Sequence, residues 1–491
     1  MMKTDTIVAV ATALSDAGIG IIRVSGDEAF EIVNKLFVNK YGKHALLNYN
    51  THTIHYGYIG YFSAKHYFIE NQKEKSIESC DNWKSHIVDE VMVTVMKAPN
   101  TYTKEDTVEI NCHGGVLLLQ KVLELIVQNG ARIAQPGEFT KRAFLNGRID
   151  LAKAEAVIDV IHSQNEFALT SSVNQLKGNV SDAIKSLREE IIYEIAFIES
   201  ALDDPEHISL DGYEEHIQEK MNSILKRVDK LIASANNGKM LKEGINTVIV
   251  GKPNAGKSSL LNRMVGEERA IVTDIAGTTR DVLQESIKLH GIGLNIIDTA
   301  GIRSTEDVVE KIGVERAKEY AGKADLILYV VDASVPLDDS DKEIMSVIKD
   351  KKVIILLNKS DLNMMITEEK LCNSLEIDSE NIYDKSIQII RTSTKENVGM
   401  EEFENVIKEM FFQGQIKAND EVIITNMRHK EALMEAKESL QMVMNSLENH
   451  MPEDFYSIDL MSAYASLGTI IGEEVGEDLV NEIFAKFCMG K

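Results

Sequence analysis

Cysteine is scarce in this chain of 491 residues, and no two cysteines form a Cys-x-x-Cys pair. This scarcity excludes a disulfide framework and a zinc site built on paired cysteines, and it fits a reducing cytoplasm. The cysteines are Cys80, Cys112, Cys372 and Cys488. The N-terminus also lacks the apolar core of a signal peptide, and no apolar run approaches the roughly 20 residues that a membrane span needs. We therefore expect a cytoplasmic protein that makes no membrane contact.

Basic residues are outnumbered, with 53 Lys and Arg against 78 Asp and Glu and a formal net charge of −25. Contacts to phosphate dominate nucleic-acid affinity, so an RNA partner would need a local basic face. Residues 1–147 hold 15 Lys and Arg against 16 Asp and Glu, which leaves a charge of −24 on residues 148–491. If RNA binds directly, we expect the contact in the N-terminal region, with Lys141 and Arg142 as the residues to test.

The length and a hydrophobic content of 44% predict about three domains with substantial cores. Short apolar runs predict an α+β domain over residues 1–147. Apolar residues then recur every three or four positions, which predicts helices over residues 148–243 and again over 412–491. We interpret these stripes as the core of one discontinuous helical bundle into which residues 244–411 are inserted. The stripe residues are Leu151, Ala154, Ile158, Ile161, Ile184, Leu187, Ile191, Ile195, Ile198, Met221, Ile224, Val228, Leu231, Leu433, Ala436, Leu440, Val443 and Leu447.

Residues 251–258 read Gly-Lys-Pro-Asn-Ala-Gly-Lys-Ser, the pattern of a phosphate-binding loop. An apolar strand precedes the loop, and a helix whose N-terminal N–H groups can face phosphates follows it. Gly251 and Gly256 permit the tight turn, and Lys257 is placed to meet the β- and γ-phosphates. Ser258 offers its hydroxyl to Mg²⁺, a hard cation that keeps few protein ligands. Such a short pattern, taken alone, also occurs as an ordinary glycine-rich turn.

Three further guanine-nucleotide motifs follow in the order that a GTPase requires. Thr279, in a Gly-Thr-Thr-Arg-Asp segment, is placed to complete the Mg²⁺ shell, and the Asp-Thr-Ala-Gly of 298–301 predicts the γ-phosphate sensor. Asp361, in the Asn-Lys-Ser-Asp of 358–361, can accept both N–H groups of the guanine edge. The residues expected to line GTP are Asn254, Ala255, Gly256, Lys257, Ser258, Ser259, Thr273, Asp274, Ile275, Ala276, Gly277, Thr278, Thr279, Asp298, Thr299, Ala300, Gly301, Asn358, Lys359, Asp361, Ser393, Thr394 and Lys395.

Four ordered motifs at strand ends predict a Ras-like P-loop GTPase domain over residues 244–411, with a mostly parallel sheet and the ligand at the carboxyl ends of its strands. Many GTPases carry a glutamine after the Asp-x-x-Gly motif to orient the attacking water. Here that position is Ile302, whose side chain forms no hydrogen bond. Another group must therefore position the water.

Several segments together resemble the tRNA-modification GTPase family MnmE, also called TrmE, of the TrmE-Era-EngA-YihA-Septin-like superfamily. They are Asn254 in the phosphate loop, Thr-Asp-Ile-Ala-Gly-Thr-Thr-Arg-Asp at 273–281, Asp-Thr-Ala-Gly-Ile-Arg at 298–303, Gly-Ile-Ile-Arg-Val-Ser-Gly at 20–26, Pro-Gly-Glu-Phe-Thr-Lys-Arg-Ala-Phe-Leu-Asn-Gly at 136–147, and the terminal Cys-Met-Gly-Lys. The resemblance extends from the first strand to the last residue, and only residues 62–84 read as an insertion. Thr394 departs from the alanine that is usual at its position.

The resemblance implies that K⁺ takes the place of an arginine finger. Its ligands would be Asn254, Thr273, Ile275 and Thr278, and Ser258 and Thr279 would hold Mg²⁺. A fixed cation beside the leaving phosphates neutralises developing charge. The family's water-orienting acid matches Glu310, so the implied catalytic residues are Glu310, Asn254 and Lys257. Without the resemblance, Glu310 is equally one more acid on an exposed helix.

The resemblance also implies an N-terminal domain that binds 5,10-methylene- or 5-formyl-tetrahydrofolate and forms a homodimer. The matching folate contacts are Arg23, Glu109, Arg148 and Lys491, and the family often has lysine where Arg148 stands. Each of these residues also has an ordinary structural interpretation; Arg23, for example, could cover an edge strand. Cys488 is either a nucleophile or a packed terminal residue, and its sequence neighbours include no base that would activate it.

Taken together, the resemblance implies a K⁺-dependent GTPase that acts with an FAD-containing, MnmG-like partner in a heterotetramer. The pair would add an aminomethyl or carboxymethylaminomethyl group to C5 of the wobble uridine, U34, of certain tRNAs. One alternative is a GTP-dependent assembly switch on ribosomal RNA without modification chemistry, but the chain shows no KH-type Gly-x-x-Gly loop. Another alternative is a folate-dependent transferase whose G domain only regulates it. The sequence leaves open which tRNAs are modified and whether glycine or ammonium is used.

Overall fold

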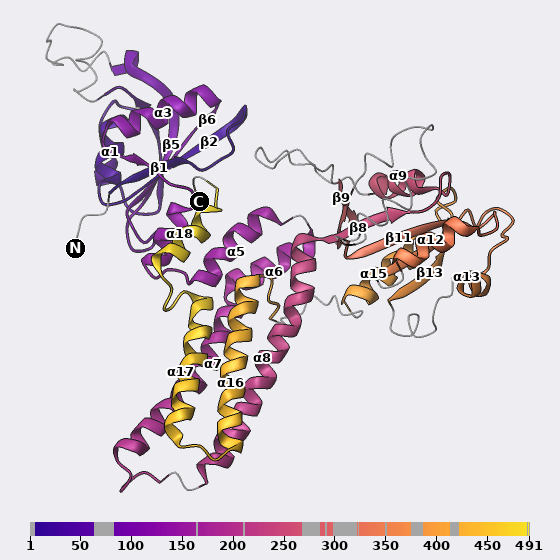
Figure 1. Ribbon diagram of the computed structural model, residues 1–491. Coiled ribbons are helices and arrows are strands. Elements are labelled where there is room, and N and C mark those ends of the chain that lie inside the picture. Colours follow the sequence, from indigo (N-terminus) through magenta and orange to yellow (C-terminus); the bar gives the residue numbers. More distant parts are fainter. Residues whose placement is uncertain are drawn as a thin grey trace. The chain divides into compact units, whose positions relative to one another are not determined.

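The computed structural model divides the chain into two compact units. The first unit joins Met1–Ile158 to Gly468–Lys491, and the second is Asp159–Leu467. The C-terminal residues therefore belong to the same unit as the N-terminal domain, although they are last in the chain (Figure 1). The structure describes residues 5–62, 83–163, 165–209, 212–267, 285–289, 292–297, 322, 324–348, 351–374, 386–412, 422–488 and 490.

A seven-stranded sheet in the order β3-β4-β5-β6-β2-β1-β7 is the centre of the first unit. Its neighbouring strands are antiparallel except β1 and β7, which are parallel. Along β5, Val91, Val93 and Val95 are buried while Glu90 and Met92 are exposed, the alternation that a strand with one covered face requires. The strands are β1 Ile7–Val10, β2 Ala17–Ser25, β3 Phe37–Asn39, β4 Thr53–Gly60, β5 Ile87–Met96, β6 Thr107–Gly114 and β7 Arg132–Ile133.

Helices complete this α+β unit, as predicted. Apolar residues of α3, among them Leu119 and Val122, pack with the buried strand residues in one continuous core. A smaller core joins Phe484 of α18 to Leu151 of α5. The helices are α1 Ala29–Leu36, α3 Val116–Gln128, α4 Glu138–Leu145, α5 Leu151–His162 and α18 Glu477–Ala485, with short 3₁₀ turns η1 Leu46–Asn48 and η2 Trp83–His86.

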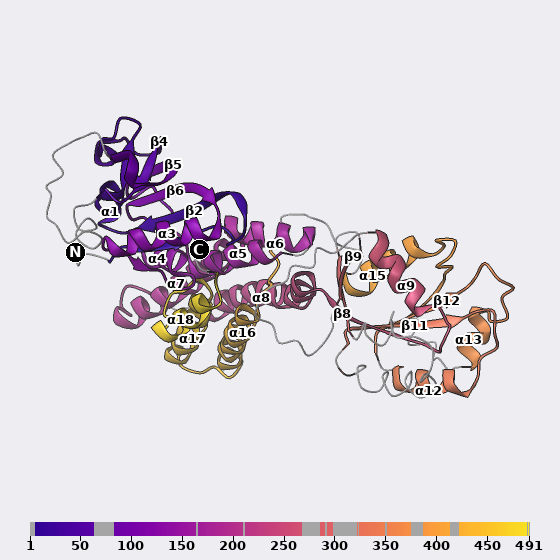
Figure 2. The ribbon, with the colours of Figure 1, turned by 90° about the horizontal axis from the view of Figure 1, so that it is seen from above.

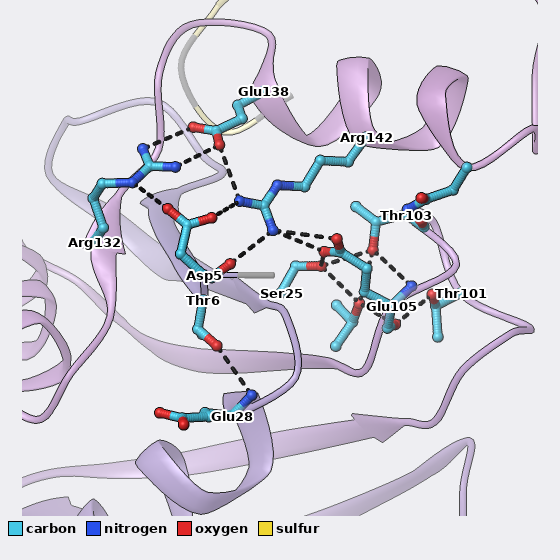
Figure 3. Close-up of polar contacts among 12 residues, drawn as sticks. Asp5, Thr6, Ser25, Glu28, Thr101, Thr103, Glu105, Arg132, Glu138 and Arg142 are labelled. Carbon is cyan, nitrogen blue, oxygen red and sulfur yellow. Dashed lines mark hydrogen bonds and ion pairs between the residues drawn. The ribbon is translucent and has the colours of Figure 1, made fainter. Parts of the chain in front are cut away.

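A charged network holds α4 against the start of the chain and the loop before β6 (Figure 3). The guanidinium of Arg142 donates to both Glu105 oxygens at 3.2 Å, to Asp5 Oδ1 at 2.7 Å and to Glu138 Oε1 at 3.1 Å. Arg132 donates to Asp5 and Glu138 from the other side, at 2.7 Å each. Because Arg142 and Glu105 are each only 8–9% exposed, removing Arg142 would leave the Glu105 carboxylate buried without this cation.

This network bears on the two residues named for the test of an N-terminal RNA contact. The guanidinium of Arg142 is buried and its donors are directed to protein carboxylates. Its neighbour Lys141 donates to Asn481 Oδ1 at 2.6 Å. Arg142 is therefore a poor choice for that test, because its charge stabilises the fold, and the N-terminal RNA contact itself stays a prediction.

Long helices of the second unit run side by side in a bundle (Figures 1 and 2). The residues of three predicted stripes are buried. These stripes extend from Ile184 to Ile198 on α7, from Met221 to Leu231 on α8 and from Leu433 to Leu447 on α16. Packing of α8 against α16 joins segments on either side of the inserted domain, as predicted. The prediction was wrong for Ile161 of α5, which is 43% exposed. The bundle helices are α6 Glu166–Lys177, α7 Asn179–Asp203, α8 Tyr213–Glu243, α16 Met427–Glu448 and α17 Glu453–Ile471, the last of which spans the boundary between the two units.

The inserted domain contains a six-stranded sheet in the order β13-β12-β11-β8-β10-β9. Every neighbouring pair is parallel except β9 and β10, so the sheet is mostly parallel, as predicted. Both faces of β11 and β12 are buried, which explains their unbroken apolar sequences. The elements are β8 Ile245–Val250, α9 Lys257–Glu267, β9 Glu285–Leu289, β10 Ile292–Ile296, β11 Leu326–Asp332, α12 Asp339–Ile348, β12 Val353–Asn358, α13 Glu368–Ser374, β13 Ile387–Arg391 and α15 Met400–Phe412.

Among the helices that the structure describes, none is both long enough and apolar enough to cross a bilayer.

Candidate nucleotide site and N-terminal ligand site

The predicted phosphate loop connects β8 to α9, and its backbone adopts conformations that its sequence allows. Gly256 has a φ of 104°, and a Cβ there would lie 2.1 Å from Nδ2 of Asn358. Asn254 has a φ of 58°, in the left-handed region that asparagine tolerates better than most residues. The glycine is therefore required by both backbone angle and space, and it lets the loop close over the first turn of α9.

Lys257 begins α9 and spans the loop. Its ammonium donates to the carbonyl oxygens of Gly251 and Lys252, at 2.7 Å each. Ser258 is the next residue of the same first helical turn. The loop thus holds a cation and a hydroxyl at a helix N-terminus, the arrangement that binds phosphate oxygens and their Mg²⁺.

Asn358 at the end of β12 joins its own Asn-Lys-Ser-Asp motif to the phosphate loop and to residues 393–395, which are also expected to line GTP. Its side-chain amide donates to the carbonyl oxygen of Ala255 in the phosphate loop at 2.8 Å, and its Oδ1 accepts from the backbone N–H of Thr394 at 3.2 Å. The Asn-Lys-Ser-Asp motif therefore supports the phosphate loop and the Ser-Thr-Lys segment at once. This role follows from the parallel order of β8, β11, β12 and β13, which brings their carboxyl ends to one edge of the sheet.

The Ser393 side chain favours the ionised form of Asp361, which is the form that can bind guanine. The hydroxyl of Ser393 donates to Asp361 Oδ1 at 2.7 Å and lowers the pKa of this carboxyl below its usual value. The carboxylate therefore stays ionised at neutral pH, and only the ionised form accepts two N–H groups. Lys359 has a φ of 61° and donates to Asp332 at 2.5 Å, a partner at the end of β11 that the sequence analysis did not single out.

Many of the predicted nucleotide and metal ligands, and the predicted catalytic Glu310, lie outside the described residues. This applies to Thr273, Asp274, Ile275, Ala276, Gly277, Thr278, Thr279, Asp298, Thr299, Ala300, Gly301 and Glu310. Of the predicted metal ligands, the structure describes Asn254 and Ser258. Of the predicted catalytic residues, it describes Asn254 and Lys257.

Three of the four predicted folate contacts come together in the first unit. Arg23 of β2 lies opposite Glu109 of β6 in the sheet register, and its Nε donates to Glu109 Oε1 at 2.8 Å. Arg23 Nη1 also donates to the carbonyl oxygen of Gly490 at 3.2 Å, which brings the chain's last residues to this cluster. Lys491 itself lies outside the described residues.

Tyr102 is the aromatic side chain around which these groups gather. Its ring centroid lies 5.3 Å from Cζ of Arg23 and 4.4 Å from Cζ of Arg148. Its hydroxyl shares a hydrogen bond with the Thr140 hydroxyl at 2.9 Å. Tyr102 was not among the residues predicted from the sequence, although it is an isolated aromatic residue in the polar segment 100–106.

The electrostatics of this cluster differ between its two arginines. Arg23 is largely buried and paired with Glu109, whereas Arg148 is exposed and its guanidinium rests on the face of Tyr102. Two guanidinium groups on one ring, only one of them paired with a carboxylate in the described part of this cluster, favour a ligand that carries negative charge. Cys488, two residues before Gly490, is exposed, and its backbone carbonyl accepts from the N–H of Gly137 at 3.4 Å.

A phosphate loop at a helix N-terminus, joined through Asn358 to an ionised guanine-type aspartate, defines a P-loop guanine-nucleotide-binding protein. The chain also matches the family described as "MnmE helical domain" over residues 151–488 and the family described as "GTP-binding protein TrmE N-terminus" over residues 6–148. The chain belongs to the MnmE family of tRNA modification GTPases.

Similar proteins span the full length of the chain. The "tRNA modification GTPase MnmE" of Lachnoclostridium phytofermentans is 56% identical over 490 residues, with 100% of both chains covered. Proteins of the same name from Clostridioides difficile and Acetivibrio thermocellus are 46% and 45% identical over 491 residues, again with 100% of both chains covered. The similarity therefore includes the N-terminal domain, the helices and the G domain together.

Proposed function

We propose that this GTPase, with an FAD-containing, MnmG-like partner, adds an aminomethyl or carboxymethylaminomethyl group to C5 of the wobble uridine of certain tRNAs. The observation that carries the proposal is that one chain of the MnmE family combines the guanine-nucleotide site with the Arg23–Glu109–Arg148 cluster. A switch that only assembled RNA would need the first site alone. The protein would work in the cytoplasm as a homodimer, and as a heterotetramer with its partner.

GTP would bind at the carboxyl edge of the G-domain sheet. The ammonium of Lys257 would contact the β- and γ-phosphates, the hydroxyl of Ser258 would bind Mg²⁺ together with Thr279, and Asp361 would accept the guanine N–H groups. Lys257 already spans the loop in the described structure, so little reorganisation would be needed on binding.

Asn254 would bind K⁺ with Thr273, Ile275 and Thr278. Its amide oxygen is a neutral, hard ligand, and its left-handed backbone is compatible with a loop that folds back over the nucleotide. The bound ion would supply positive charge beside the leaving phosphates. Glu310 would orient the attacking water through a further water, because Ile302 has no group that could do so.

A reduced folate, 5,10-methylene- or 5-formyl-tetrahydrofolate, would bind at Arg23, Glu109, Arg148 and Lys491 and supply the one-carbon unit. The residues present fit such a ligand. Glu109 is a half-buried carboxylate that can accept from the amino edge of a pterin, and Arg148 is an exposed cation suited to the carboxylates of a glutamate tail. The Tyr102 ring would keep the Arg148 guanidinium in place.

Modified nucleosides in tRNA test the proposed function. In a strain that lacks this protein, we expect the wobble uridines of the affected tRNAs to lose their C5 substituent. The wild-type gene should restore the substituent, and a Lys257→Ala gene should not. Unchanged nucleosides in the deletion strain would reject the modification activity and favour the assembly switch. Restored modification by Asp298→Ala would instead favour a transferase whose G domain only regulates it.

Folate binding tests the N-terminal site. Arg148→Ala is expected to weaken binding of 5-formyl-tetrahydrofolate by about tenfold to a hundredfold, because a charge-assisted hydrogen bond contributes about 1.5–3 kcal/mol. Isothermal titration calorimetry of the full chain measures this change. The control is Arg391→Ala, an exposed arginine of the G domain that pairs with Glu368. Equal affinity in wild type and Arg148→Ala would remove Arg148 from the site, and no binding by the wild type would remove the folate donor from the proposal.

A further inference from the structure

Lys252, the second residue of the phosphate loop, is anchored outside the nucleotide site. Its ammonium lies 2.7 Å from Oδ2 of Asp341 and 2.9 Å from Oδ2 of Asp338. The side chain of Asp341 is 1% exposed and that of Lys252 is 20% exposed, so the main contact of this ion pair is protected from solvent. None of the motifs that define a GTPase requires a charged residue at this position.

The carboxylate that receives Lys252 is fixed from two other directions. Tyr329 of β11 is fully buried, and its hydroxyl donates to Asp341 Oδ1 at 2.7 Å. The backbone N–H of Asp338 donates to Asp341 Oδ2 at 2.9 Å. Asp338 in turn accepts from the N–H groups of Ser340 and Asp341 at the start of α12, so the two acids form a reciprocal cap of that helix. Lys252 is thus bound to a rigid part of the domain.

The same residue supports the catalytic lysine of the loop. The backbone carbonyl oxygen of Lys252 accepts a hydrogen bond from the ammonium of Lys257 at 2.7 Å, alongside that of Gly251. A displacement of residue 252 would therefore displace one of the acceptors that orient Lys257. Through its side chain and its carbonyl, Lys252 connects the start of α12 to the ammonium that meets the phosphates.

Solvent screens the ion pair between Lys252 and Asp341 less than it screens an ion pair on the surface. Exposed pairs contribute little to stability, whereas the Asp341 side chain is 1% exposed while Lys252 is paired with it. Removing the ammonium would leave a buried carboxylate, and the loop and the start of α12 would rearrange to solvate it. The first turn of the phosphate loop is the part that would move.

We propose that Lys252, Asp341 and Tyr329 form an anchor that positions the phosphate loop and thereby sets the affinity for GTP and GDP. Lys252 is a positioning residue in this account, since it acts through the acceptors of Lys257. The anchor keeps the loop in its binding conformation before the nucleotide arrives, so its loss appears mainly as weaker binding. Hydrolysis of bound nucleotide also requires Lys257, so loss of the anchor lowers turnover as well, but by less than it lowers affinity, because the bound phosphates themselves help to hold the Lys257 ammonium.

Nucleotide titration of the full chain tests the anchor. In Lys252→Ala, the Kd for GDP and for a non-hydrolysable GTP analogue should rise by about tenfold, and kcat at saturating GTP should fall by a smaller factor than the rise in Kd. Lys252→Arg, which restores a cation, should return Kd to near the wild-type value. Lys342→Ala removes an exposed lysine from α12 and serves as the matched control. A wild-type Kd in Lys252→Ala, or an equally weak Lys252→Arg, would overturn the proposal.

A conservative second variant keeps the test decisive if Lys252→Ala does not fold. Tyr329→Phe preserves the ring and the packing of β11 and removes only the hydroxyl that holds Asp341. Its Kd for GDP should rise by about threefold with a folded circular dichroism spectrum, less than in Lys252→Ala, because Lys252 and the Asp338 N–H still hold the Asp341 carboxylate. An unchanged Kd in folded Tyr329→Phe would show that Asp341 does not act on the loop.

Discussion

Replacing Asp361 by asparagine is expected to weaken GTP binding by about two to four orders of magnitude and to allow xanthosine triphosphate to bind. The carboxylate accepts two N–H groups of guanine, and hydrogen bonds to a charged group contribute about 1.5–3 kcal/mol each. An asparagine offers one acceptor and one donor, which match the N–H and the carbonyl of xanthine. The Ser393 hydroxyl, 2.7 Å from Oδ1, can still donate to the amide oxygen, so the loop should keep its conformation.

Competition titrations with GTP, XTP and ATP on the full chain measure this change in specificity. Asp339→Asn is the matched control because Asp339 is a fully exposed carboxylate on the same domain. It should bind GTP as the wild type does. Wild-type GTP affinity in Asp361→Asn would mean that the guanine edge lies elsewhere and that the Asn-Lys-Ser-Asp segment only supports the phosphate loop.

GTP turnover in Na⁺ is expected to be about a thousandfold slower than in K⁺, the scale of an arginine finger. The proposed reason is that the site built around Asn254 fits the larger ion, and that without it the charge developing on the leaving phosphates is not neutralised. Phosphate release measured at constant ionic strength in KCl and NaCl tests this directly. Equal rates in the two salts would discard the ion site.

Single substitutions distinguish residues needed for the effect of K⁺ on turnover from residues needed for nucleotide binding. Asn254→Ala should lower turnover in K⁺ to the level seen in Na⁺ while GDP still binds, because Lys257 and Asp361 remain. Asn222→Ala, at an exposed position of α8, is the control and should leave turnover unchanged. Glu310→Ala should bind GTP and hydrolyse it slowly, and normal turnover in that variant would remove Glu310 from the mechanism.

The G domain was predictable because its function depends on local sequence. A phosphate loop must place glycine where φ is positive, a lysine at the helix N-terminus and a hydroxyl beside it. The motif can therefore be recognised from the sequence alone, by the spacing of Gly251, Gly256, Lys257 and Ser258. The helical stripes were predictable for a similar reason, because burial of one helix face imposes a period of three to four residues. Ile161 shows where this fails, since it continues the stripe of α5 in sequence although its side chain is 43% exposed.

Other features depended on side chains that are far apart in the chain. In the sequence, nothing distinguishes Arg142 from an arginine on the surface. Only the fold shows that Asp5, Glu105 and Glu138 surround it. Tyr102 acquires its place beside Arg23 and Arg148 through the loop before β6, and Gly490 joins them from the far end of the sequence. The sequence likewise gives Lys252 no role beyond that of a loop residue. Only the structure shows that it pairs with Asp341 of α12, which also accepts from Tyr329 of β11.

By itself, the sequence determined that this chain binds guanine nucleotide, that its G domain interrupts a helical region, and that an α+β domain precedes both. Short motifs and periodicities indicate these properties. Both reflect backbone angles, helix ends and buried faces, which are set by residues close together in the chain. Only the tertiary structure decided which charges are buried, which residues complete the N-terminal cluster, and what holds the phosphate loop. The physical reason is that the strength of a charge or hydrogen bond depends on its solvent exposure and its partners, and both are fixed when distant segments pack.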